Sequence, residues 1–187
     1  MQEFNIICRA SLNNTMKKVT LIIMRHAKSD WHTGEHDFDR PLSQRGVRDA
    51  ARMGKWLSSS GYLPDQIIAS PATRTKQTVE LLCKASGLDI KQVVWEKSFY
   101  CLGMQNLLDT AIKYFAVNNT VMLVGHNPVM DELLHYLSDV DVPSTQGGKY
   151  MTTANIAIFE INKDSEKFLH AGSGNLLTLV RPKEIDT

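Results

Sequence analysis

The sequence predicts an α/β fold, a three-layer αβα sandwich around a mostly parallel sheet with an antiparallel edge. From residue 19 to residue 137, short β-rich apolar runs alternate with longer amphipathic segments. This alternation is typical of parallel strands connected by helices. After residue 150 the apolar runs are separated only by short turns that contain Asn, Asp or Gly. Such spacing indicates antiparallel strands at the end of the chain.

The expected strands follow from short apolar runs. The run VTLIIM (19–24) is almost wholly apolar, as a strand buried on both faces would be. The others are QIIAS (66–70), VVW (93–95), TVMLVG (120–125), ANIAIFEI (154–161), KFLHA (167–171) and NLLTLV (175–180).

The expected helices have apolar residues at i, i+3 and i+4 spacing. They cover residues 43–61, 70–87, 104–115 and 127–137. Ser70 is predicted to be the N-cap of the second helix, because serine accepts a hydrogen bond from a free N–H of the first turn. Asn127, followed by Pro128, is predicted to cap the last helix in the same way.

Length and composition limit the possible classes of protein. The chain has 187 residues, which suits one domain, and its formal net charge is +1. Such a charge gives no overall attraction to nucleic acid or to an anionic membrane. Cys8, Cys83 and Cys101 are widely spaced and include no CxxC pair, so free thiols in a reducing compartment are expected.

Neither a secretory signal at the first residues nor a membrane span is expected. No basic segment leads into a long apolar run there, and no apolar stretch approaches the roughly 18 to 20 residues that a bilayer requires. Met16, which two lysines and the first expected strand follow, resembles an initiator methionine at the start of a domain. Residues 1–15 are therefore expected to be a peripheral or disordered extension, residues 16–187 a single domain, and the cytoplasm the location.

Ionisable residues follow the expected strands. Arg25 and His26 follow the first strand, Glu96 the third and His126 the fourth, while Arg74 lies in the first turn of the helix after the second strand. The carboxyl ends of parallel strands lie along one edge of a sheet, where ligands bind. Two arginines, two histidines and one carboxylate are thus predicted to meet at that edge.

This set of side chains suits phosphoryl chemistry. Two guanidiniums and two helix N-termini would bind a compact dianion. Positive surroundings should lower the pKa of His26 below about 6.5, which leaves a neutral nucleophile. Its attack on phosphorus would give a phosphohistidine that water then hydrolyses, with His126 donating a hydrogen bond to the phosphoryl oxygens. No metal or other cofactor is expected, because the arginines would offset the phosphoryl charge.

Four motifs resemble the histidine phosphatase superfamily, and most of all its small phosphohistidine phosphatase (SixA-like) branch. They are MRHAKSDW, RPLSQRG, ASPATRTKQTVELL and LVGHNP, and the likeness spans about residues 17 to 182. The resemblance implies a phosphoglycerate mutase-like fold and a hydrolase acting on phosphoric monoesters or phosphohistidine. It also implies that His26 is the phosphorylated nucleophile and that Arg25, Arg74 and His126 complete the phosphate pocket.

The sequence departs from the family pattern at two positions. Ala27 replaces the glycine of the Arg-His-Gly signature, and Glu96 is only a weak match to the family's proton donor. Asp30, in the loop after the nucleophile, is the other candidate for that role and for substrate binding. An imidazole leaves phosphorus more easily than an alkoxide, so a phosphohistidine substrate needs less acid assistance.

The expected substrate is accordingly a phosphorylated protein that carries phosphohistidine. The alternatives are a small phosphoester substrate, or a non-catalytic module that only binds phosphate. The long insertions that cover the site in sugar-phosphate enzymes of the family have no counterpart here.

Overall fold

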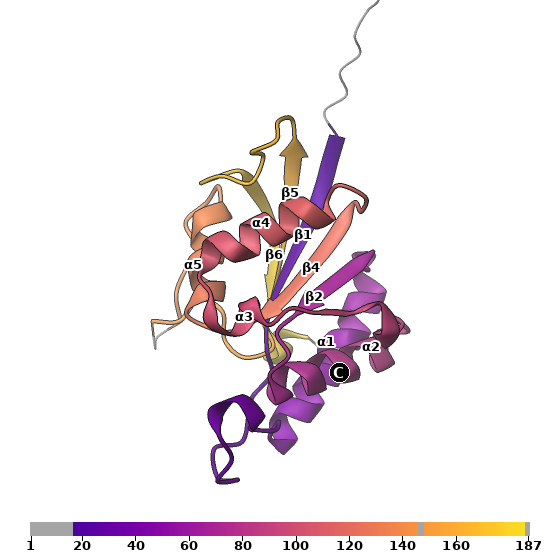
Figure 1. The fold of residues 1–187 in the computed structure, drawn as a ribbon, viewed down its shortest axis with the longest axis vertical. Helices are drawn as coiled ribbons and strands as arrows, with labels where there is room; N and C mark the ends of the chain where they lie inside the picture. Colours follow the sequence, from indigo (N-terminus) through magenta and orange to yellow (C-terminus); the bar gives the residue numbers. More distant parts are fainter. Residues whose placement is uncertain (1–16, 146–147, 186–187) are drawn as a thin grey trace, which may run out of the picture.

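The computed structural model describes residues 17–145 and 148–185, and it contains a six-stranded sheet in the order β3-β2-β4-β1-β5-β6 (Figure 1). The strands are β1 (Lys17–Arg25), β2 (Gln66–Ala69), β3 (Val94–Trp95), β4 (Thr120–Gly125), β5 (Ile156–Lys163) and β6 (Gly174–Val180). Strands β1 to β4 pair in parallel, whereas β5 is antiparallel to β1 and β6 is antiparallel to β5. The predicted α/β fold with an antiparallel edge is confirmed.

Helices cover both faces of the sheet (Figure 1). They are α1 (Gln44–Ser60), α2 (Thr73–Ser86), α3 (Ser98–Cys101), α4 (Met104–Tyr114) and α5 (Val129–Leu137). Short 3₁₀ turns occur at η1 (Asp37–Asp39), η2 (Ile90–Gln92) and η3 (Pro182–Glu184). Helices α1 and α2 pack on one face, and α4 and α5 pack on the other.

Strand β1 lies between two hydrophobic cores, because alternate side chains of a strand point to opposite faces. Leu21 and Ile23 join the core under α4 and α5. Ile22 and Met24 join the core under α1 and α2, and all four side chains are fully buried. Each such burial is worth about 1.5–3 kcal/mol. The residues that follow β1 are therefore held on a firmly anchored strand.

Helices α1 and α2 approach each other closely at Gly54. A Cβ atom at this position would lie 2.5 Å from the carbonyl oxygen of Leu82, so only glycine fits without a shift of the backbone. At the start of α1, Gly46 lies against the backbone of Lys28 in the same way. These two contacts hold α1 against both α2 and the loop that follows β1.

Three expectations about local structure were wrong. The N-cap position of α2 is Ala72, because the N–H of Ser70 still donates to Val124 in the sheet, at 3.0 Å. Pro128, and not Asn127, occupies the N-cap position of α5. The segment 167–171 is not a strand: Phe168 is buried in the core from the β5–β6 connection without pairing.

Two further expectations concern the ends and the location of the chain. The predicted extension over residues 1–15 lies outside the described residues. Within residues 17–145 and 148–185, no helix has both the length and the apolar character needed to cross a bilayer.

Candidate active site

Neighbouring strand ends bring the predicted histidines together. Arg25 and Gly125 are partners in the register of the parallel strands β1 and β4. His26 and His126 are the next residues after these two, so they lie next to each other. The N–H of His26 donates to Gly125 at 3.0 Å, and the two imidazole centroids are 5.0 Å apart. From α2, Arg74 places its Nε 3.3 Å from Nε2 of His26. His26, His126 and Arg74 therefore lie together at one edge of the sheet, as predicted.

The ring of His26 is fixed in one orientation. Its Nδ1 lies 2.7 Å from the carbonyl oxygen of Ala27, which can only accept a hydrogen bond, so Nδ1 carries the proton. The lone pair is then on Nε2, where Nε–H of Arg74 donates to it. Only 8% of the His26 surface is exposed. The nitrogen that could attack phosphorus is therefore the one beside the guanidinium.

Burial is the main reason that His26 is neutral. It lowers the pKa of His26 well below 6.5, and the neighbouring His126, Arg74 and Arg25 lower it further. The hydrogen bond to Ala27 acts in the opposite direction but does not cancel these effects. The neutral imidazole was predicted from the positive surroundings, whereas the structure assigns the largest effect to loss of water.

His126 is also neutral and is oriented by hydroxyl groups. Its Nε2 lies 2.8 Å from Oγ of Ser70 and 3.5 Å from Oγ1 of Thr75. Burial, followed by the charge of Arg74, lowers its pKa to about 4. Ser70, which was expected to cap a helix, instead orients this histidine.

Arg25 connects the pocket to the loop before β5. Its NH1 donates to the carbonyl oxygen of Met151 at 2.9 Å, and Nδ2 of Asn127 donates to the same oxygen at 3.2 Å. Nε of Arg25 is buried and has no hydrogen-bond partner among the described residues. Because an unpaired buried donor is unfavourable, this group is suited to an anion that supplies the missing acceptor.

Asp37, which the sequence did not single out, holds the outer side of Arg74. NH2 of Arg74 lies 3.0 Å from Oδ2 of Asp37, and NH1 donates to the carbonyl oxygen of the same residue. Burial opposes ionisation of Asp37, but hydrogen bonds from Arg40 and Tyr100 prevail and lower its pKa to about 2. A carboxylate thus fixes the guanidinium that faces the nucleophile.

Aromatic side chains surround this arrangement. The ring of Tyr100 is 5.6 Å from that of His126, and the ring of Phe38 is 5.0 Å from that of Tyr100. The guanidinium of Arg40 lies 3.6 Å from the centre of the Trp31 ring. Phe38 and Tyr100 are partly exposed, and Trp31 is 66% exposed. We call Trp31, Phe38 and Tyr100 the aromatic rim. These residues lie on a loop, on η1 and on α3, where the sequence has no periodic apolar pattern.

The two candidate proton donors make local contacts. Glu96 accepts hydrogen bonds from the N–H and the hydroxyl of Ser98, at 3.0 and 2.8 Å, and these bonds lower its pKa. Asp30 accepts from the N–H of His32 at 2.9 Å. Among the described residues, neither carboxylate hydrogen-bonds to the histidines or arginines of the pocket. Their roles stay predictions.

Comparison with known proteins supplies the family. A model of the histidine phosphatase superfamily (branch 1) matches residues 21–96. An uncharacterized chloroplastic protein of Arabidopsis thaliana is 33% identical over 165 residues, which cover 82% of this chain and 72% of that protein. The chain belongs to the histidine phosphatase superfamily. It is a phosphatase, as the motifs predicted.

Solved structures of SixA proteins are similar to the structure of this phosphatase. The putative phosphohistidine phosphatase SixA from Agrobacterium tumefaciens is 27% identical, with a TM-score of 0.70 over 88% of this chain and 99% of that one. SixA complexed with tungstate has a TM-score of 0.75 over 90% of this chain and 100% of that one, but at 19% identity it shows only the shared fold. A phosphoglycerate mutase of Clavibacter michiganensis is 37% identical over 73 residues, which cover 36% of this chain and 28% of the mutase.

Proposed function

We propose that the phosphatase hydrolyses phosphohistidine in proteins through a covalent intermediate on His26. The observation that carries this proposal is the state of the His26 ring. Its Nδ1 is bound to Ala27, its Nε2 lone pair points at Arg74, and its lowered pKa keeps it neutral. A neutral, oriented imidazole beside a guanidinium is what nucleophilic attack on a phosphoryl group requires.

The reaction has two displacement steps at phosphorus. In the first, Nε2 of His26 forms a bond to phosphorus while the bond to the substrate imidazole breaks, and that imidazole takes up a proton as it leaves. In the second, water attacks phospho-His26, the bond to Nε2 breaks and inorganic phosphate is released. Arg25 and Arg74 would bind the phosphoryl oxygens in both steps, and they would offset the charge that develops there.

Two features favour a protein substrate over a small phosphoester. Glu96 is bound to Ser98 and its pKa is lowered, so it is poorly suited to protonating a leaving group. A departing imidazole depends on such a donor less than an alkoxide does. In addition, the exposed aromatic rim offers apolar surface to a docking protein.

A comparison of substrates tests the proposal. The wild-type enzyme would be given a phosphohistidine protein and a panel of small phosphate esters, and phosphate release would be measured. We expect kcat/KM for the phosphohistidine protein to exceed that for each ester by at least tenfold. A higher kcat/KM for a small ester would reject the proposal and favour the phosphoesterase alternative, which the partial likeness to phosphoglycerate mutases also suggests.

A further inference from the structure

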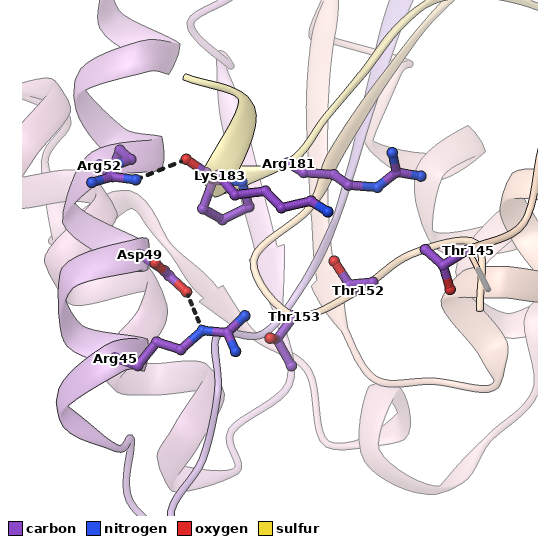
Figure 2. Close-up of a pocket in the computed structure, with 9 residues that line it drawn as sticks. Arg45, Asp49, Arg52, Thr145, Thr152, Thr153, Arg181 and Lys183 are labelled. Atoms are coloured by element: carbon purple, nitrogen blue, oxygen red, sulfur yellow. Dashed lines mark hydrogen bonds and ion pairs between the residues drawn. The ribbon is translucent and has the colours of Figure 1, made fainter. Parts of the chain in front are cut away.

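A second, basic pocket lies beside the active site. It has a volume of about 380 Å³ and is formed by α1, by the segment before β5 and by η3 (Figure 2). Four cationic residues line it, whereas Asp49 is the single acidic residue in its lining. The four are Arg45, Arg52, Arg181 and Lys183.

Positive charge exceeds negative charge in this pocket. Arg45 pairs with Asp49 at 3.2 Å, and Arg181 pairs with Glu184 at 3.0 Å. Arg52 donates to the carbonyl oxygen of Pro182, which is neutral. Within the described part of the chain, Lys183 has neither a hydrogen bond nor an ion pair to a carboxylate, so the charges of Arg52 and Lys183 are not offset.

Donors from three segments line the space. In Figure 2 the ammonium group of Lys183 and the hydroxyl of Thr152 point toward one another, and the guanidinium of Arg45 points toward Thr153. Nε of Arg181 is buried and unpaired among the residues described. Guanidinium, ammonium and hydroxyl donors around a small volume are suited to a carboxylate.

The chain connects this pocket directly to the catalytic residues. Thr152 and Thr153 follow Met151, whose carbonyl oxygen accepts from Arg25. The next residue, Ala154, donates its N–H to the carbonyl oxygens of Arg25 and His26, at 3.1 and 3.2 Å. The segment 151–154 therefore contributes both to the lining of the basic pocket and to the contacts that hold Arg25 and His26.

We propose that this pocket binds acidic side chains that flank the phosphohistidine of the protein substrate. The inference rests on the proposed function, since it assumes a protein substrate. The volume fits one or two aspartate or glutamate side chains. Complementary charge of this kind raises the association rate and selects among partners. The pocket would therefore discriminate between phosphohistidine sites by their flanking residues.

Two phosphohistidine peptides, identical except for flanking glutamates in one and glutamines in the other, test the proposal. For the wild-type enzyme at low salt we expect kcat/KM to be about tenfold higher for the glutamate peptide. The variant Lys183→Glu should reduce this ratio to about one. Lys167→Glu makes the same change of charge on an exposed residue of the β5–β6 connection, at the opposite end of β5, and it should leave the ratio unchanged. Salt at about 0.5 M should lower the wild-type ratio by screening.

The outcomes separate this inference from the proposed function. If both peptides are hydrolysed with equal kcat/KM, or if Lys183→Glu leaves the ratio as it was, the basic pocket has no part in recognition and the inference fails alone. If neither peptide is hydrolysed by an enzyme that turns over an aryl phosphate, the proposed function fails and the inference fails with it.

Discussion

His26 has two neighbours that make it a nucleophile, the carbonyl group of Ala27 and the guanidinium of Arg74. Asparagine at position 26 retains a polar side chain but cannot form a phosphohistidine. We therefore expect His26→Asn to lower kcat by about 10⁴ or more, as loss of other covalent nucleophiles does. Hydrolysis of an aryl phosphate measures this loss, with circular dichroism to show that the variant folds.

His170→Asn is a suitable control for that variant. His170 is exposed in the connection between β5 and β6, away from the strand ends that carry the site. Its replacement should leave kcat within twofold of the wild-type value. An asparagine at position 26 that retained a tenth of the activity would show that the nucleophile is another group.

Glu96→Gln distinguishes a proton donor from a structural residue. The hydrogen bonds from Ser98 lower the pKa of Glu96, so the carboxyl group is ionised near pH 7. We expect the substitution to reduce kcat/KM by less than threefold, both for an aryl phosphate with a good leaving group and for an alkyl phosphate with a poor one. A loss confined to the alkyl phosphate would establish Glu96 as the acid that the family resemblance implies.

The sequence predicted the residues of the pocket that follow strands, but it did not predict Asp37 and Tyr100, which lie on short helical turns. Arg25, His26 and His126 have positions fixed by strand register, which apolar periodicity indicates. Asp37 pairs with Arg74 from a 3₁₀ turn, and Tyr100 donates to Asp37 from the four-residue helix α3. The positions of these two side chains depend on contacts between segments that are distant in the sequence, and the local sequence does not predict such contacts.

At the scale of the elements, the close contact between α1 and α2 at Gly54 predicts that alanine at this position destabilises the protein. Alanine inside a helix is normally more favourable than glycine by about 1 kcal/mol. Here the added Cβ would lie 2.5 Å from the carbonyl oxygen of Leu82, so the helices must move apart. We expect Gly54→Ala to lower the free energy of unfolding by about 2 kcal/mol, a typical cost of overpacking. Urea denaturation measures this change.

Ser58→Ala, on the exposed side of the same helix, serves as the control for Gly54→Ala. It changes helix propensity without a change in packing, so the free energy of unfolding should stay within about 0.5 kcal/mol of the wild-type value. A Gly54→Ala variant as stable as the wild type would show that α1 and α2 can separate without cost.

The boundaries of helices were harder to predict than their existence. Apolar spacing located α1, α2, α4 and α5, because each buries one face against the sheet. Ser70 and Asn127 have side chains that favour N-caps, yet both contribute to the site instead, through His126 and Met151. Tertiary contacts therefore overrode the local preference of these two residues.

At the scale of the whole molecule, burying neutral histidines makes folding sensitive to acid. The pKa of His126 is about 4 in the folded protein and about 6.5 in an unfolded chain, so between these values the unfolded state binds more protons. Stability is then complete above pH 6.5 and falls as the pH drops toward 4. A difference of about 2.5 in pKa corresponds to about 3 kcal/mol. The lowered pKa of His26 makes stability fall with decreasing pH in the same way. Asp37, whose pKa is about 2, causes a further loss of stability at still lower pH.

The pH dependence of the unfolding free energy, measured with urea between pH 8 and pH 4, tests this account. We expect the wild-type value to decline steadily below pH 6.5, and we expect His126→Asn to decline by about 3 kcal/mol less over the same range, because asparagine does not titrate. Because only the slopes of the two curves are compared, a pH-independent loss of stability caused by the substitution does not affect the result. If the wild-type and His126→Asn curves ran parallel, the pKa of His126 would be the same in the folded and the unfolded protein, and burial would not lower it.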